Sequence, residues 1–289
     1  VWPVLEQAKK TSADEFVMFG KWLFELASKE HKDKLTLILP AELKDFAIWV
    51  EQLIEESLGH DGKGITVVYG EQLSGDVIRS AKDNDRVFVR VNIGGKQTRQ
   101  DLWNFFNENS YPVAEFNVAD VTEIGRLMLG FQMAVATVGY MWDICYVDQP
   151  GVEGYKKATR EVQEKLPKGQ QVTVPQDWQS VKFGQLNLYF GTLLNAGVLT
   201  PESLKAEVLR LGLTMDDAAA VYAAALNLLR GKFELSEMAS YGRLTAATRA
   251  VFEDARYKIF TRGLKLTSKL GEGPDKNHSY HQNVAQGRD

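Results

Sequence analysis

Strand-like and helix-like segments alternate through the first half of the chain, which predicts an α/β fold. The strand-like runs are continuously apolar, as expected of parallel strands covered by helices on both faces. From about residue 176 onward helical patterns dominate. We therefore predict a three-layer αβα sandwich with a mainly parallel sheet, plus a largely helical segment in the C-terminal half.

Four apolar runs are predicted to be parallel strands, at 34–39, 65–69, 86–92 and 113–118. Helical spacing of apolar residues between them predicts crossover helices at 40–58, 71–82 and 98–107. We expect the next strand of this sheet to come from the C-terminal quarter. A short strand at 258–261 is also expected.

The most apolar segment, 124–144, is predicted to be a buried helix. A membrane-spanning helix needs about 20 residues with almost no charge, but this segment contains Arg126 and Gln132. In the second half, Thr200 followed by Pro201 indicates a capped helix start. We divide the chain into an α/β domain at 1–170, a mainly helical insertion at 171–265 and a C-terminal loop at 266–289.

Composition narrows the class of function. The chain has 289 residues, 34 Lys and Arg against 38 Asp and Glu, and a formal net charge of −4. This balance argues against a nucleic-acid partner, which requires a dense basic face. A single cysteine, Cys145, excludes an internal disulfide and, with no signal peptide, indicates the cytoplasm. The start without Met and the abrupt end lead us to expect a piece of a longer protein.

Three polar segments could carry chemistry, and each also has a simple structural interpretation. Segment 52–64 ends a predicted helix, with Glu55 and Glu56 in its last turn. The simple interpretation is a solvated surface pair of glutamates, whose unfavourable interaction with the helix dipole costs about 0.5 kcal/mol. Segment 148–157 has the features of a surface helix start. Segment 277–287 holds His278 and His281, which suit acid–base chemistry, a metal site if helical, or a polar loop.

Taken together, these segments resemble the phosphoglucose isomerase (glucose-6-phosphate isomerase) family, specifically its C-terminal sugar-isomerase (SIS) half. The string Gln-Leu-x-x-Glu-Ser-x-Gly-x-x-Gly-Lys-Gly at 52–64 is similar to the segment of the family's catalytic glutamate, which falls on Glu56. Asp-Gln-Pro-Gly-Val-Glu at 148–153 is similar to the lysine-bearing segment and implies Lys156. His-Ser-Tyr-x-Gln-x-x-x-Gln-Gly at 278–287 is similar to the segment of the ring-opening histidine and implies His278, with His281 as the fallback.

The resemblance covers residues 33–160 throughout, whereas 170–240 does not follow the family pattern. The histidine segment comes last here, as in isomerase domains fused to transaldolase. The family keeps its Ser/Thr-rich phosphate loop and a catalytic arginine in an N-terminal SIS half. Its members are usually homodimers in which the histidine reaches the neighbour's active site.

The resemblance implies an isomerase that interconverts glucose 6-phosphate and fructose 6-phosphate, serving glycolysis and gluconeogenesis without a metal or redox cofactor. Glu56 would transfer the proton between C2 and C1 through an enediolate, and His278 with Lys156 would open the sugar ring. Ser57, Gln52 and Gln282 would bind substrate. The alternative is a non-catalytic SIS module that binds a sugar phosphate in a regulatory protein.

Overall fold

The computed structural model describes residues 2–81, 84–165, 180–183, 186–195, 197–273, 278–279 and 282–283. The chain forms two compact units, a larger one of residues 1–160 and 235–289 and a smaller one of residues 161–234. The smaller unit takes in the first part of the segment expected as a helical insertion. Residues 235–265, the last part of that segment, pack within the larger unit.

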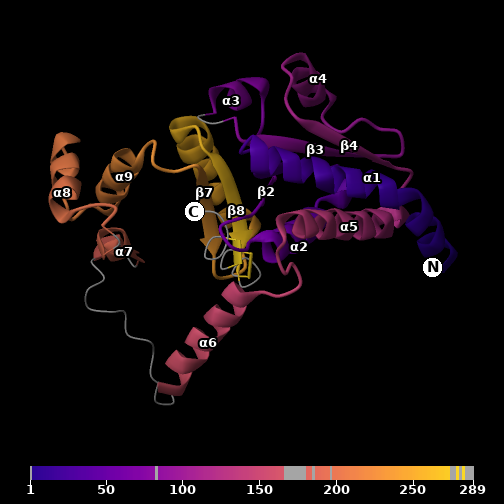
Figure 1. Cartoon of the computed structure of the whole chain (residues 1–289). Helices are drawn as coiled ribbons and strands as arrows, with labels where there is room; N and C mark the ends of the chain where they lie inside the picture. The colour runs from indigo at the N-terminus through magenta and orange to yellow at the C-terminus, as the bar shows by residue number, and fades with distance from the viewer. Residues whose placement is uncertain are drawn as a thin grey trace. The chain divides into compact units, whose positions relative to one another are not determined.

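The larger unit is built on a four-stranded sheet in the order β2-β1-β3-β4, and every neighbouring pair is parallel. Its position among the helices is shown in Figure 1. All four predicted strands are confirmed. They are β1 (Lys34–Ile38), β2 (Thr66–Tyr69), β3 (Arg86–Ile93) and β4 (Val113–Val118).

Helices cover both faces of this sheet, which confirms the predicted three-layer sandwich. One face packs against α1 (Trp2–Lys29), α2 (Phe46–Leu58) and α5 (Ile124–Trp142). The other packs against α3 (Gly75–Ser80) and α4 (Gln100–Glu108). Two short 3-10 turns, η1 (Ala41–Leu43) and η2 (Val121–Glu123), precede α2 and α5. The long helix α1 is not predicted by the sequence analysis.

Strand β3 carries a different set of side chains on each of its two faces. Val87, Val89 and Val91 contribute to the core beneath α1, α2 and α5. Phe88 points to the opposite core, where its ring lies 4.0 Å from that of Phe106 in α4. Because successive side chains of a strand alternate between faces, the buried Arg86 and Arg90 share the face of Phe88, where each pairs with a carboxylate. Strand β3 is therefore apolar towards α1, α2 and α5 and mixed in character on its other face.

Helices α1 and α5 lie side by side on the sheet (Figure 1). The ring of Phe16 stacks on Phe116 at 4.7 Å and reaches the surface of α5 at Gly130. A Cβ atom at Gly130 would lie only 2.2 Å from the Phe16 ring. The glycine therefore allows the two helices to approach closely.

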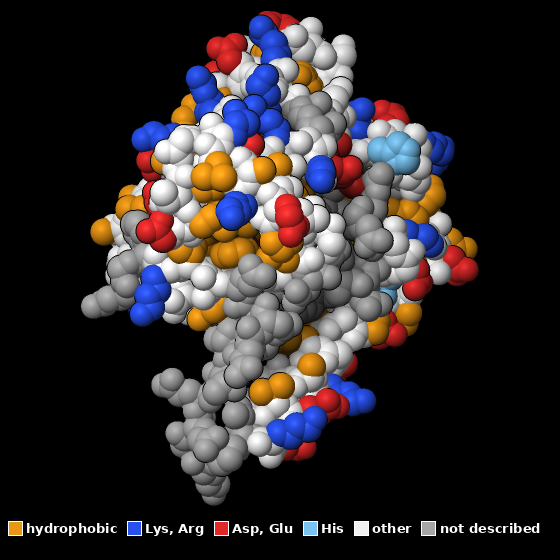
Figure 2. Space-filling view, turned by 90° about the vertical axis from the view of Figure 1, so that its left-hand side faces the viewer, with side chains coloured by type: hydrophobic (Ala, Val, Ile, Leu, Met, Phe, Trp, Pro, Cys, Tyr) orange, Lys and Arg blue, Asp and Glu red, His pale blue; other side chains and the backbone are white. Residues whose placement is uncertain are grey.

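Helix α5 is the predicted buried helix, and its inward face is lined by Leu127, Phe131, Val135 and Val138. Among the residues described here, no helix is both long and apolar enough to cross a membrane. On the face drawn in Figure 2, basic side chains lie among acidic and hydrophobic ones, in line with the nearly balanced charge.

The C-terminal part of the larger unit differs from two sequence expectations. β7 (Leu235–Ser240) and β8 (Thr267–Glu272) form a parallel sheet of their own, with β8 near β2, so they do not extend the main sheet. The expected strand at 258–261 is wrong. Helix α10 (Ala246–Ala255) continues there into a π-helix, η3 (Arg256–Leu264).

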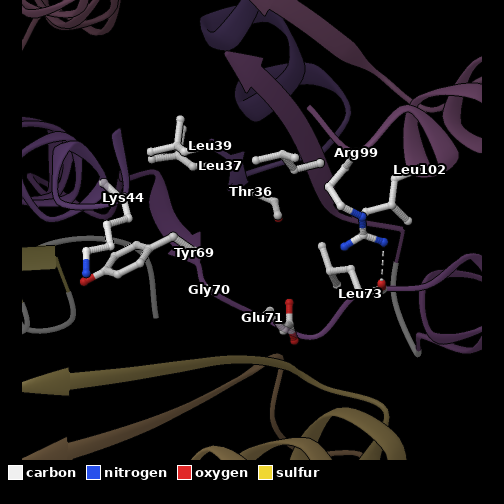
Figure 3. A pocket seen from close by; sticks show the side chains of 12 residues that line it. Thr36, Leu37, Leu39, Lys44, Tyr69, Gly70, Glu71, Leu73, Arg99 and Leu102 are labelled. Atoms are coloured by element: carbon white, nitrogen blue, oxygen red, sulfur yellow. Dashed lines mark hydrogen bonds between the residues drawn. The ribbon is translucent and has the colours of Figure 1, made fainter. Parts of the chain in front are cut away.

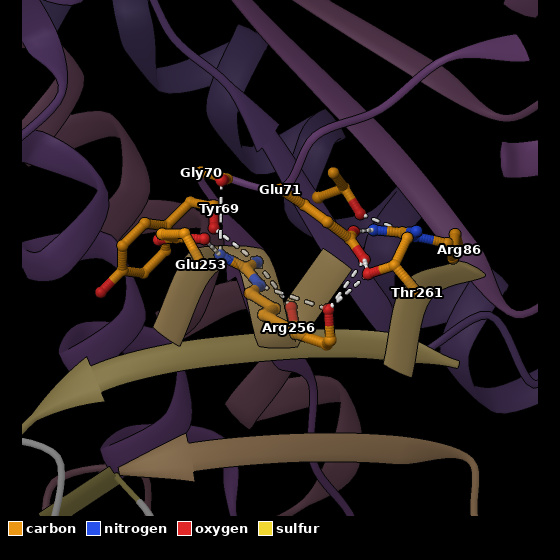
Figure 4. Close-up of polar contacts among 9 residues, drawn as sticks. Tyr69, Gly70, Glu71, Arg86, Glu253, Arg256 and Thr261 are labelled. Carbon is orange, nitrogen blue, oxygen red and sulfur yellow. Dashed lines mark hydrogen bonds and ion pairs between the residues drawn. The ribbon is translucent and has the colours of Figure 1, made fainter. Parts of the chain in front are cut away.

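A buried polar cluster surrounds Arg256, the residue at which helix α10 continues into the π-helix η3 (Figure 4). The Arg256 guanidinium donates to the carbonyl oxygens of Tyr69 at 3.0 Å, Gly70 at 3.3 Å and Ser268 at 2.6 Å. Glu71 pairs with Arg86 and accepts a hydrogen bond from Thr261 at 3.1 Å. Burial alone would raise the pKa of Glu71, but the two arginines lower it. These bonds join the end of β2 to η3 and β8.

The smaller unit has its own core and is largely helical, as predicted. An antiparallel hairpin, which the sequence analysis did not predict, precedes three helices. Thr200 caps the second helix with its side chain, as expected from the Thr-Pro signal. The elements are β5 (Ser180–Phe183), β6 (Leu186–Tyr189), α7 (Gly191–Asn195), α8 (Pro201–Arg210) and α9 (Ala218–Leu229), around Leu204, Val208, Val221 and Ala224.

We expect Gly130→Ala to lower the free energy of unfolding by about 1–3 kcal/mol, because overpacking against Phe16 outweighs the better helix propensity of alanine. Gly125 lies in the same helix with open space around its Cβ position. Gly125→Ala should therefore be stabilising, by about 0.5 kcal/mol. Chemical denaturation of both variants checks the opposite signs, and equal effects would contradict the close approach of α1 and α5.

Candidate functional site

The three segments singled out in the sequence meet in the larger unit. Glu56 lies in the last turn of α2, and its Oε1 is 3.5 Å from Nδ1 of His278. Lys156, in α6 (Pro150–Lys165), and Gln149, just before that helix, also act on the Glu56 carboxylate. The chain thus brings a carboxylate, an imidazole, an amide and an ammonium group together from positions up to 222 residues apart along the chain.

Glu56 is largely buried, with 13% of its side chain exposed. Burial raises its pKa above the usual range of a glutamate. His278, a hydrogen bond from Gln149 and Lys156 partly oppose this rise. A carboxylate with a raised pKa and adjacent donors is suited to accept and return a proton near neutral pH.

Glu55 is even more buried, at 2%, so the interpretation of Glu55 and Glu56 as a solvated surface pair is wrong. Its Oε1 accepts hydrogen bonds from the backbone of Val67, at 2.7 Å, and from Lys269, at 2.5 Å. Successive helix positions point about 100° apart. The two glutamates therefore have different surroundings, Glu55 facing β2 and β8 and Glu56 facing His278.

Lys269 is the centre of a buried ion cluster that we call the Lys269 clamp, formed by Glu51, Glu55, Tyr69 and Lys269. Lys269 Nζ lies 2.7 Å from Glu51, and Tyr69 donates to the other oxygen of Glu51 at 3.0 Å. Burial opposes a charge on Lys269, but the neighbouring carboxylates raise its pKa, so it is an ammonium. The clamp ties α2 to β2 and β8, one residue before Glu56.

Gln282 holds the three segments to one another. Its fully buried side chain donates to the carbonyl of Gly59 at 2.7 Å and accepts from the backbone of Gly151 at 2.9 Å. The neighbouring Asn283 donates to Thr66 at 3.1 Å. In this conformation both polar ends of the predicted substrate-binding Gln282 are engaged with the backbone.

The glycines of the 52–64 segment permit this close packing. A Cβ at Gly59 would lie 2.6 Å from Cα of Asn283, and one at Gly64 would lie 2.3 Å from its side-chain oxygen. At Gly59 the close atoms belong to the backbone, so no other residue type fits, whereas a Cβ at Gly64 would displace the side chain of Asn283. The glycines of segment 52–64 therefore allow the histidine-bearing segment to pack directly against the end of α2.

Two further bonds fix the loop that follows α2. His60 is buried, and its Nε2 lies 3.1 Å from the carbonyl oxygen of Asp148, at the start of the lysine-bearing segment. Lys63 donates to the carbonyl of Trp142 at 2.7 Å, at the end of α5. These contacts explain why polar residues occur in this loop.

The remaining predicted site residues lie around Glu56. Gln52 and Ser57 are partly buried on α2. Lys156 is 40% exposed and pairs with Glu153 at 2.9 Å. His278 is 39% exposed and lies beside the Glu56 of its own chain, rather than away from it. His281 lies outside the described residues.

Two residues at the site were not singled out from the sequence. Gln149 lies in the 148–153 string that resembles the family's lysine-bearing segment, but the sequence predicted no role for this residue. Lys269 lies in β8, whose sequence Thr-Ser-Lys-Leu-Gly-Glu is mostly polar although the strand is buried. The local pattern therefore contains no signal for it, and only its burial shows that its charge must be paired. The described residues contain no group of three or more metal-ligating side chains.

A cavity of about 300 Å³ lies at the opposite end of α2, beside the carboxyl ends of β1 and β2. Figure 3 shows Lys44, Tyr69, Glu71 and Arg99 around it. Arg99 donates to the carbonyl of Leu73 at 3.1 Å. Glu71 is already satisfied by the cluster of Figure 4. This cavity is separated from Glu56 by most of the length of α2.

Comparison with known proteins finds relatives among the isomerases. A glucose-6-phosphate isomerase of Pediococcus pentosaceus is 29% identical over 149 residues, covering 39% of this chain and 33% of the relative. Those of Lactobacillus helveticus and Lactobacillus delbrueckii subsp. bulgaricus are each 30% identical over 150 residues, covering 40% of this chain and 34% of the relative. No family model matches the chain.

The chain therefore spans about a third of the length of the curated relatives it matches. Identity of this level over this length supports a distant relation to glucose-6-phosphate isomerases.

We expect Lys269→Met to lower the free energy of unfolding by about 3–5 kcal/mol, because it leaves two buried carboxylates without their cation. Lys258 is the matched control, since its pair with Asp254 is exposed. Lys258→Met should cost no more than about 0.5 kcal/mol. Chemical denaturation of the two variants gives the comparison, and a mild effect at Lys269 would show that the clamp is not structural.

The Glu56 pKa provides a second test. NMR titration of the Glu56 carboxyl carbon should give a pKa above that of exposed glutamates. Lys156→Met should raise it further, because removing a positive neighbour disfavours the carboxylate. Lys157→Met, one position on and exposed, should leave it unchanged. A normal or lowered pKa for Glu56 is incompatible with the burial described.

Proposed function

We propose that the chain is the C-terminal SIS portion of an aldose–ketose isomerase that interconverts glucose 6-phosphate and fructose 6-phosphate. The observation that carries the proposal is the buried, high-pKa Glu56 beside His278, with Gln149 and Lys156 acting on the same carboxylate. The distant relation to glucose-6-phosphate isomerases supports the same reaction class.

Glu56 acts as the base that removes the proton from C2 of the open-chain sugar and returns it to C1. The proton lies beside a carbonyl and is weakly acidic, so the base must be positioned and must have a pKa near the working pH. Burial supplies the raised pKa. The negative charge that develops on the enediolate oxygens needs donors nearby, and Gln149 and Lys156 are placed to contribute.

His278 and Lys156 open the ring, one by protonating the ring oxygen and the other by accepting the C1 hydroxyl proton. Imidazole suits this step because it changes charge near neutral pH. The partial exposure of His278 and Lys156 leaves both accessible to substrate. Gln52 and Ser57 bind the substrate, and we assign Gln282 to positioning because its amide is engaged with Gly59 and Gly151.

In this proposal, the phosphate-binding loop and a catalytic arginine belong to an N-terminal SIS half of the same protein. The complete enzyme is a homodimer in the cytoplasm. The single cysteine of the sequence, Cys145, fits a reducing compartment. The reaction moves protons only, and the side chains named above supply the acid and the base, so we propose a mechanism without a metal or redox cofactor.

The decisive test is Glu56→Gln in the complete protein. The amide keeps the size of the side chain but cannot accept the proton, so kcat should fall at least about 100-fold while sugar-phosphate binding remains. Steady-state kinetics in both directions, with calorimetric binding of a hexose phosphate, measure the two effects.

Glu108 offers a matched control, because it is an exposed glutamate at the end of α4. Glu108→Gln should leave kcat unchanged. Glu55 is unsuitable as a control, since it belongs to the Lys269 clamp. If Glu56→Gln keeps more than a tenth of the activity, Glu56 is not the base. If the intact protein binds a sugar phosphate without isomerising it, the regulatory-module alternative holds.

A further inference from the structure

A second cavity, of about 260 Å³, lies along α2 between that helix and β8. We call it the α2–β8 cavity. Its volume is just below the roughly 300 Å³ at which small-molecule sites begin, so it fits a fragment of a few carbon atoms. Its lining includes Ile48, Glu51, Gln52, Arg249, Leu270 and Ser279.

The α2–β8 cavity is next to the proposed reaction centre. Gln52 lines it and lies four residues before Glu56, so the two side chains share one face of α2 about 5–6 Å apart. Ser279 also lines it and directly follows His278, whose ring lies 3.5 Å from Glu56. A substrate with its carbonyl end at Glu56 can therefore extend into this cavity.

Ser279 carries an unsatisfied polar group at this cavity. The residue is 1% exposed, and among the described residues its Oγ has no hydrogen-bond partner. A buried hydroxyl without a partner is unfavourable. Because the Oγ atom is itself buried, rotation of the Ser279 side chain towards the cavity would be needed for a ligand hydroxyl to serve as its donor or acceptor and remove that cost.

The charges around the cavity select the kind of ligand. Glu51 pairs with Lys269, which it shares with Glu55, and Arg249 pairs with Glu272. Among the described residues that line the cavity, Arg249 is the one cation, and its charge is paired, so these residues offer no free cation to a phosphate. The amide of Gln52 and the hydroxyl of Ser279 can each donate and accept, and Ile48 and Leu270 supply an apolar wall for C–H groups.

We propose that the α2–β8 cavity binds the uncharged, hydroxyl-bearing carbons of the substrate, and that Ser279 determines specificity by hydrogen-bonding one of those hydroxyls. This inference rests on the proposed function, because it takes Glu56 as the position of the reacting carbons. The phosphate of the substrate lies outside this cavity.

The test compares two probes on the complete protein, a hexitol 6-phosphate and inorganic phosphate. A hexitol phosphate has the hydroxyl chain but no carbonyl, so its binding is independent of turnover. Ser279→Ala should weaken hexitol 6-phosphate binding about 3- to 10-fold, the worth of one neutral hydrogen bond. Binding of inorganic phosphate should not change, and Ser279→Thr, which keeps the hydroxyl, should restore most of the affinity.

Ser80→Ala is the matched control, because its hydroxyl bonds to Val77 at 3.0 Å outside this cavity; it should leave both affinities unchanged. Ile48→Trp fills the cavity from its partly exposed wall and should weaken hexitol phosphate binding while the protein stays folded. Equal losses for both probes, or no loss in Ser279→Ala, overturn the inference. In the Glu56→Gln background, Ser279→Ala should weaken hexitol 6-phosphate binding by the same factor. This binding measurement does not depend on turnover, so it can fail while Glu56 is still the base, or hold while Glu56 is not the base.

Discussion

The buried ammonium of Lys269 is the interaction on which the arrangement of this protein's site depends. It is held between Glu51 and Glu55 of α2, while Tyr69 and the backbone of Val67 bring in β2. Removing these charges from water is costly, and only their mutual contacts repay it. The register of α2 against β2 and β8 is therefore specified by a polar contact, and the direction of Glu56 follows from that register.

A second constraint is the close approach of main chains at the end of α2. Gly59 and Gly64 leave space that residues 282 and 283 occupy, and Gln282 then bonds to Gly59 and Gly151. The histidine-bearing segment is thus positioned by backbone contacts, not by its own imidazole. His278 and Lys156 are left partly exposed, which is compatible with the roles we propose for them.

Local sequence patterns were sufficient to predict the four strands of the main sheet. The four parallel strands are short and rich in apolar and β-branched residues, whereas α2 is longer and has an apolar stripe at Phe46, Val50, Ile54 and Leu58, so length and periodicity distinguish them. The π-helix at 256–264 could not be predicted in this way. Its β-branched and aromatic residues suit a strand, but Arg256 bonds to Tyr69, Gly70 and Ser268, and these distant partners hold the segment helical.

The sequence by itself determined the αβα class, the four parallel strands and the three segments that carry the polar chemistry. Each of these rests on spacing along the chain or on residue types within a short string. Only the tertiary structure decided that Glu55 and Glu56, adjacent and chemically identical, differ in surroundings. One faces Lys269 in the core and the other faces His278 at a partly open site. The physical reason is that solvation and charge are set by neighbours in space, here more than 200 positions away in the chain, and no local pattern contains them.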